Sequence, residues 1–220
     1  MLFGTEMPMF AWLHRKPTPA SEDERRVRDA LAGYPLYDPP RWTSEDQPVR
    51  PIIDEYRAYF LDNRNRRVEA LSRFLAKFDV ALSVDDEGVR AVSAWCPAYA
   101  DLLVDGLEHY YENDAIWHAY HSFEAPWTGP LTGLNPIFDL GVYLGECMLS
   151  RNPRLKWMPL LDPELNKGAS HPIFGQRSGR PFDPIKSTYT DCKNIHSARM
   201  AKRKPDVMSL YMKIRARAAE

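Results

Sequence analysis

Apolar residues recur every three or four positions in the first half of the chain, which is the spacing of one face of an α-helix. Between residues 52 and 78 this stripe consists of Ile52, Tyr56, Tyr59, Phe60, Val68, Leu71, Leu75 and Phe78. The intervening positions are strongly basic and include Arg64, Arg66, Arg67, Arg73 and Lys77. Charged runs of this kind usually cover the side of a helix that faces water, so we interpret these five residues as a solvated surface.

A shorter helix is predicted before this stretch, within a segment that prolines interrupt. Ser21 can cap its first turn, which is acidic, and Gly33 can end it. Its apolar side is narrow, so we expect the helix to lie on a larger body. We therefore divide the chain into a proline-punctuated N-terminal arm with one short helix, residues 1–48, and a single domain, residues 49–220.

Two further helical segments are indicated downstream. Residues 83–97 favour a helix that Ser83 or Asp85 caps and that Pro97 ends. Residues 135–160 are the most apolar passage of the chain, and their first part has helical periodicity. Gly141 and Gly145 lie four residues apart in it and would allow a neighbouring backbone to approach closely.

The segment after this helix resembles a pair of short strands. Leu155 and Trp157 alternate with other residues in 154–160, and residues 171–176 form a second candidate strand. A stretch rich in Asp, Pro, Asn and Gly separates them, as in an antiparallel ribbon. The sequence therefore predicts an α+β fold, mostly helical, with a small antiparallel β-sheet in the C-terminal half.

Three polar residues of the apolar helix are candidate catalytic groups. Asp139, Tyr143 and Glu146 follow the spacing i, i+4, i+7 and share one helical face, so the carboxylates could act as general acid and base. Glycosidase-type chemistry, however, needs carboxylates that face each other across a substrate, and these two lie about 10 Å apart along one helix axis. We favour an anchoring role, with Glu146 largely buried and held by backbone N–H groups or a basic side chain. The basic candidates are Arg90, Lys156 and Arg177.

Histidines in an aromatic-rich segment provide the best candidate metal site. Asp114, His118 and His121 could approach one divalent ion, such as zinc, on one side of a helix. The spacing lacks the H-E-x-x-H arrangement, and no further strong ligand is evident. We therefore expect no cofactor, and we keep a metal-dependent hydrolase that uses residues 114–121 as the alternative function.

Composition excludes several classes of protein. The chain has 220 residues, 44% of them hydrophobic, and its 29 basic and 30 acidic side chains nearly cancel, which argues against a general nucleic-acid binder. No apolar run reaches the roughly 20 residues of a membrane span, and the N-terminus lacks the basic region of a secretory signal. The three cysteines are widely spaced, which indicates reduced thiols and not a set of disulfide bonds or a zinc site. We expect a cytoplasmic protein.

No motif of a nucleophilic or nucleotide-binding enzyme is present. The chain contains no G-x-S-x-G, G-x-G-x-x-G or G-x-x-x-x-G-K-[ST] pattern, and Cys147 lies among apolar residues that keep a thiol protonated. Trp, Tyr, Arg and Met, the residue types that anchor interfaces, are well supplied. We therefore expect a non-enzymatic module that binds another protein.

Part of the sequence is similar to a loose group of uncharacterised bacterial proteins. The resemblance covers about residues 78–176, in DVALSVDDEGVRAVSAWC, GVYLGECMLSRNPRLKWMPL and HPIFGQ. It rests mainly on Tyr143, Leu144, Gly145, Glu146 and Trp157. It implies a helix packed on a small sheet, and, because some members look like immunity or accessory proteins of toxin gene clusters, a role in binding a protein. The N-terminal arm and residues 107–127 do not belong to this pattern.

Overall fold

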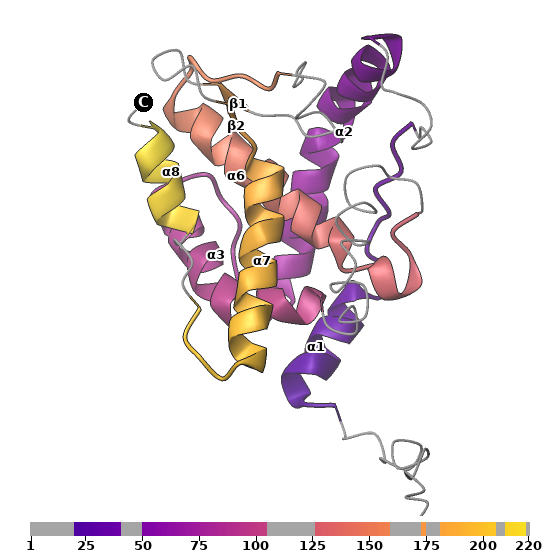
Figure 1. Ribbon diagram of the computed structural model, residues 1–220, viewed down its shortest axis with the longest axis vertical. Helices are drawn as coiled ribbons and strands as arrows, with labels where there is room; N and C mark the ends of the chain where they lie inside the picture. The colour runs from indigo at the N-terminus through magenta and orange to yellow at the C-terminus, as the bar shows by residue number, and fades with distance from the viewer. Residues whose placement is uncertain are drawn as a thin grey trace, which may run out of the picture.

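The computed structural model describes residues 20–40, 50–104, 126–158, 173–174, 181–205 and 210–218. These residues are mainly helical (Figure 1). The helices are α1 (Glu22–Leu31), α2 (Arg50–Ala76), α3 (Asp86–Tyr99), α6 (Leu134–Arg151), α7 (Pro184–Met200) and α8 (Leu210–Ala218). Two 3-10 turns, η1 (Ala100–Leu103) and η2 (Gly129–Leu131), and two strands, β1 (Ile173–Phe174) and β2 (Pro181–Phe182), complete the elements.

Helix α6 is the centre of the fold. All of its residues from Leu134 to Gly145 are buried, which explains why this passage is the most apolar of the chain. Helices α7, α2 and α8 pack against it, and Figure 1 shows α7 lying between α8 and α2. A helix that is covered on all sides needs apolar residues around its whole circumference, so each polar residue on it requires a specific partner.

Helices α6 and α7 approach each other closely at Gly141. A Cβ atom added there would lie 2.6 Å from the Cα of Ile185, in the first turn of α7. The predicted close approach of a neighbouring backbone is therefore confirmed at this position. Any larger residue would push α7 away from α6.

The predicted N-terminal helix is confirmed as α1. The Ser21 hydroxyl accepts a hydrogen bond from the Glu24 backbone N–H at 3.1 Å, and the Glu24 carboxylate accepts one from the Ser21 N–H at 2.8 Å, which completes a capping box. Gly33 follows the helix with a φ of +74°, a conformation that favours glycine. Val27 and Ala30 pack into the core. The division into residues 1–48 and 49–220 stays a prediction.

Helix α3 begins as predicted and ends later than predicted. The Asp85 side chain caps it by accepting a hydrogen bond from the Gly88 N–H at 2.9 Å. Pro97 lies inside the helix, which continues to Tyr99, so the prediction that Pro97 ends it is wrong. The proline occupies the last turn, where its missing N–H removes a single helical hydrogen bond.

The predicted α+β fold is wrong, and the described part of the chain is all-α in character. Its β-structure is an isolated bridge at Trp157 and an antiparallel pairing of β1 with β2, in which Ile173 is opposite Phe182 and Phe174 is opposite Pro181. Strand β1 lies within the predicted strand 171–176, but its partner is β2 and not residues 154–160. Leu155 and Trp157 are buried, and the Trp157 ring packs edge-on against Phe60 of α2, with centroids 4.9 Å apart.

Beyond the single β-bridge at Trp157, the alternation at these two positions reflects burial in a helical core, which a short apolar pattern cannot distinguish from a sheet. Residues 159–160, 171–172 and 175–176 of the predicted strands lie outside the described residues.

Among the residues that the structure describes, no helix combines the length and the apolar character that crossing a bilayer requires.

Candidate functional site

Asp139 is the most deeply buried carboxylate that the structure describes, and it is fully paired. Arg67 Nε of α2 donates a hydrogen bond to Asp139 Oδ1 at 2.7 Å, and the Tyr34 hydroxyl donates one to Oδ2 at 2.6 Å. The side chain of Asp139 has no exposed surface. This contact joins α2, α6 and the segment after α1, so Asp139 fixes the relative positions of three parts of the fold.

Burial also alters the protonation of this group. Loss of solvation raises the pKa of Asp139 to about 6, although Arg67 and the Tyr34 hydroxyl act in the opposite direction. Burial, followed by the charge of Asp139, raises the pKa of Tyr34 well above its usual value. Tyr34 therefore remains a hydrogen-bond donor at neutral pH.

The other two candidate catalytic groups have separate partners. The Tyr143 hydroxyl donates to the Ser83 carbonyl at 2.6 Å, at the start of the turn that leads into α3. Glu146 Oε1 accepts a hydrogen bond from the Trp157 indole N–H at 2.8 Å and lies 3.5 Å from Arg64 Nη1. Asp139, Tyr143 and Glu146 thus share a helical face but are not brought together around one point.

A basic side chain pairs with Glu146 as predicted, but it is Arg64, which is not among the three candidates. Arg90 packs on the Tyr211 ring at 4.9 Å, and Arg177 lies outside the described residues. The side chain of Glu146 keeps 22% of its surface exposed, so it is less buried than expected and holds Trp157 from the edge of the core.

Arg67 is a candidate site residue that the sequence pattern does not single out. The pattern predicts a solvated side chain, but only 5% of Arg67 is exposed. A signal was present, because Arg67 lies seven residues from both Phe60 and Phe74, and all three are on the buried stripe of α2. A charged residue on the buried side of a helix needs an opposite charge nearby, and Asp139 on α6 provides it for Arg67 on α2.

A polar hollow of about 400 Å³ lies beside Arg67, and we call it the arginine cavity. Its walls include Leu36, Tyr59, Arg66, Arg67, Glu69 and Arg73. Three guanidinium groups face one carboxylate in this lining, so positive charge is in excess.

The inner wall of the arginine cavity is held in place from α6. Asn135 Oδ1 accepts a hydrogen bond from the Tyr37 backbone N–H at 2.8 Å, and Arg67 Nη1 donates to the Pro35 carbonyl at 2.9 Å. The remaining group of the guanidinium, Nη2, is buried and has no hydrogen-bond partner within the part of the chain that the structure describes. Asp139 and the Pro35 carbonyl thus fix the position of Arg67 in the cavity wall.

A second hollow has the opposite character, and we call it the apolar cavity. It measures about 370 Å³ and lies among α3, α6, α7 and α8, with Cys96, Ala100, Leu140, Cys192, Ile195 and Leu210 in its walls. Burial raises the pKa of Cys96 to about 12 and also raises that of Cys192. Both thiols are therefore protonated at neutral pH, as is Cys147, whose pKa burial raises to about 11.

The candidate metal ligands Asp114, His118 and His121 lie outside the described residues. The hydrolase alternative therefore stays a prediction, which metal analysis of the purified protein tests. Among the described residues, no group of three or more His, Cys, Asp and Glu side chains could hold a metal ion.

Comparison of the chain with protein-family models, with curated proteins and with solved structures finds no match. The resemblance to the bacterial group with the G-x-Y-L-G-E helix stays a prediction. Function therefore has to be argued from the two cavities and from the contacts of the polar residues around them.

Proposed function

We propose that the protein is a non-enzymatic module that binds another protein, and that an acidic side chain of this partner enters the arginine cavity. The observation that carries the proposal is the cavity lining, in which the exposed Arg66 and Arg73 lie beside Arg67, and Arg67 is held in place by its buried pair with Asp139. The two exposed guanidinium groups are donors that a partner's carboxylate can reach from solvent.

The charge of the lining favours a carboxylate as the group that is bound. Arg66 and Arg73 are exposed and lie one above the other on α2, seven residues apart, on the same side as the cavity. A carboxylate that enters the cavity would therefore lie close to two exposed guanidinium groups. Hydrogen bonds between guanidinium and carboxylate are about twice as strong as neutral ones.

The rim of the cavity provides apolar contact area for a protein. Leu36 is 38% exposed, and Tyr59 is partly exposed across from it. Arginine and tyrosine are enriched at the centres of protein interfaces, where they surround the few contacts that carry most of the binding energy. This combination suits an acidic side chain presented by a folded surface.

The contacts of the candidate catalytic groups support a binding role. Both oxygens of Asp139 already accept hydrogen bonds, and the Tyr143 hydroxyl is engaged by a backbone carbonyl. Each group has a structural contact that proton transfer to a substrate would break. Asp139 therefore serves better as a fixed support of Arg67 in the cavity wall, and Tyr143 as a link between α6 and the turn before α3, than as members of a catalytic group.

An experiment in two stages tests this proposal. The protein is first used to capture its partner from the cell of origin, and the partner is then purified and titrated against the wild type, Arg66→Glu and Arg73→Glu. Each charge reversal is expected to weaken the affinity about tenfold, equivalent to about 1.4 kcal/mol. Arg203→Glu, an exposed reversal that is not in the cavity wall, is the matched control and should bind like the wild type.

Three outcomes would overturn the proposal. Failure to capture any stoichiometric partner would contradict the binding function. Equal affinities for the wild type and both cavity variants would contradict the site. Tight binding to random single-stranded oligonucleotides with a steep salt dependence would assign the cavity to nucleic acid instead.

A further inference from the structure

The apolar cavity is independent of the arginine cavity and has a different lining. Its side chains come from α3, from Leu140 on α6, from α7 and from the start of α8. We propose that it binds an aliphatic carboxylate such as a medium-chain fatty acid, with the chain among the apolar walls and the carboxylate at Lys204.

The polar atoms in the wall are engaged with other protein groups. Ser93 Oγ accepts a hydrogen bond from the Tyr211 backbone N–H at 3.0 Å, and Thr188 Oγ1 donates to the Pro184 carbonyl at 2.9 Å. Asp191 forms an ion pair with Lys213 of α8. These groups therefore offer little hydrogen bonding to a solute, and the remaining surface is that of aliphatic side chains and protonated thiols.

The size and polarity of the cavity favour an apolar occupant over water. A dry apolar cavity of roughly 150 Å³ is enough to bind benzene, because water gains too few hydrogen bonds in such a space. The present cavity has a volume of about 370 Å³. It can therefore hold a longer molecule, and burial of each methylene of a chain contributes about 0.8 kcal/mol.

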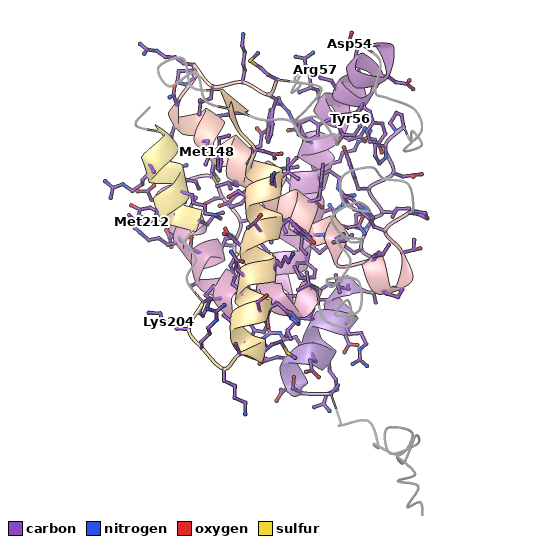
Figure 2. All side chains as sticks on the ribbon, viewed as in Figure 1. Asp54, Tyr56, Arg57, Met148, Lys204 and Met212 are labelled. Carbon is purple, nitrogen blue, oxygen red and sulfur yellow. The ribbon has the colours of Figure 1, made fainter. Side chains whose placement is uncertain are left out.

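Lys204 provides the charge that selects the head group. It is exposed and lies in the wall of the apolar cavity, while the nearest carboxylate of the lining, Asp191, is neutralised by Lys213. Figure 2 shows Lys204 in the segment that leaves the lower end of α7, away from Asp54 and Tyr56 on α2. A cation at the edge of an apolar space matches a molecule with an aliphatic chain and an anionic end.

Titration calorimetry with decanoate, decanol and decyltrimethylammonium tests the proposal directly. Decanoate should bind the wild type more tightly than decanol, and decyltrimethylammonium should bind most weakly. Lys204→Glu should weaken decanoate binding by at least about threefold, since an exposed ion pair contributes up to about 1 kcal/mol, and should leave decanol unaffected. Arg203→Glu is the control for a change in net charge. Ala100→Leu, which fills the cavity, should weaken decanoate and decanol alike.

Thiol protection gives a second readout that needs no variant. Cys96 and Cys192 are in the wall, whereas Cys147 is not. Decanoate should slow the modification of Cys96 and Cys192 by methyl methanethiosulfonate, as followed by peptide mass spectrometry, and leave that of Cys147 unchanged. Absence of binding by all three amphiphiles would overturn the proposal. So would equal binding of decanoate and decyltrimethylammonium, or equal protection of all three cysteines.

Discussion

Arg67 Nε lies 2.7 Å from Asp139 Oδ1, and this buried pair joins α2 to the central helix α6. The side chains of the two residues are 6% and 0% exposed, so neither charge is supported by water. The same arginine contributes to the wall of the arginine cavity. The structural contact and the proposed binding site therefore share one guanidinium group.

Replacing one residue of this pair should lower the stability of the fold more than replacing both. Asp139→Leu leaves the Arg67 guanidinium buried without its carboxylate, and we expect it to lower the free energy of unfolding by about 3–5 kcal/mol. In Arg67→Met/Asp139→Leu no buried charge remains, so much of this loss should be recovered. Urea denaturation of the wild type, both single variants and the double variant measures the coupling. Additive losses would show that the two side chains act independently.

The raised pKa of Asp139 predicts a particular dependence of stability on pH. The pKa is about 6 in the folded state, compared with about 3.9 in an unfolded chain. Between these values the folded state binds a proton that the unfolded state has released, so the contribution of this group is complete below about pH 4 and is lost as pH rises through 6.

Asp139→Asn provides the reference, because asparagine does not titrate. The free energy of unfolding of the wild type should fall relative to this variant by about 2 kcal/mol between pH 4 and pH 7, because most of the roughly two-unit difference in pKa takes effect in this range. Parallel denaturation curves of the two proteins over this range measure the difference. A rise of the wild type relative to the variant would show that Arg67 lowers the pKa more than burial raises it.

The contact between Glu146 and Trp157 should be weaker than the Arg67–Asp139 pair, because Glu146 is partly exposed. Trp157→Phe removes the indole donor while keeping an aromatic ring against Phe60, so we expect a loss of about 1–2 kcal/mol. Glu146→Gln keeps an acceptor and should cost less than Glu146→Ala. Thermal melts of the three variants test this order. An unchanged or higher melting temperature for Glu146→Ala would indicate that this carboxylate is retained for function.

Gly141 should not accept a side chain, although alanine is the better helix former. Gly141→Ala would gain about 1 kcal/mol of helix propensity, but its Cβ would lie 2.6 Å from the Ile185 Cα, a backbone atom that cannot move by itself. Overpacking of this kind costs about 1–3 kcal/mol, so we expect a net loss of stability in chemical denaturation. A stabilised variant would show that α6 and α7 are not in such close contact.

The sequence was sufficient for elements that local chemistry determines. The cap at Ser21, the stop at Gly33 and the periodic stripe of α2 were all readable from neighbouring residues, because capping and amphipathicity act within a few turns. The burial of Arg67 is harder to predict, because a run of arginines resembles a solvated face. Only its seven-residue spacing from both Phe60 and Phe74 places Arg67 on the buried side of α2.

The C-terminal half shows why the remainder of the fold was not predictable. Leu155 and Trp157 alternate as a strand does, yet the partner surfaces of Trp157 are Phe60 and Glu146, which are distant in sequence. The arginine cavity likewise depends on Tyr37 being held by Asn135, 98 residues away. Such tertiary contacts leave no local signal, so neither cavity could be anticipated from spacing alone.

Site-specific photocrosslinking tests the central claim most directly, because it reports where a partner lies. A photoreactive phenylalanine analogue placed at Leu36, on the rim of the arginine cavity, should crosslink to the partner, and Arg73→Glu should reduce the yield of that crosslink when the partner concentration is below the wild-type Kd. The same analogue at Met212 is the control, since Met212 is also exposed but lies on α8 at the opposite side of the molecule from α2 in Figure 2. Crosslinks to the partner at Met212 but not at Leu36 would contradict the proposed binding site.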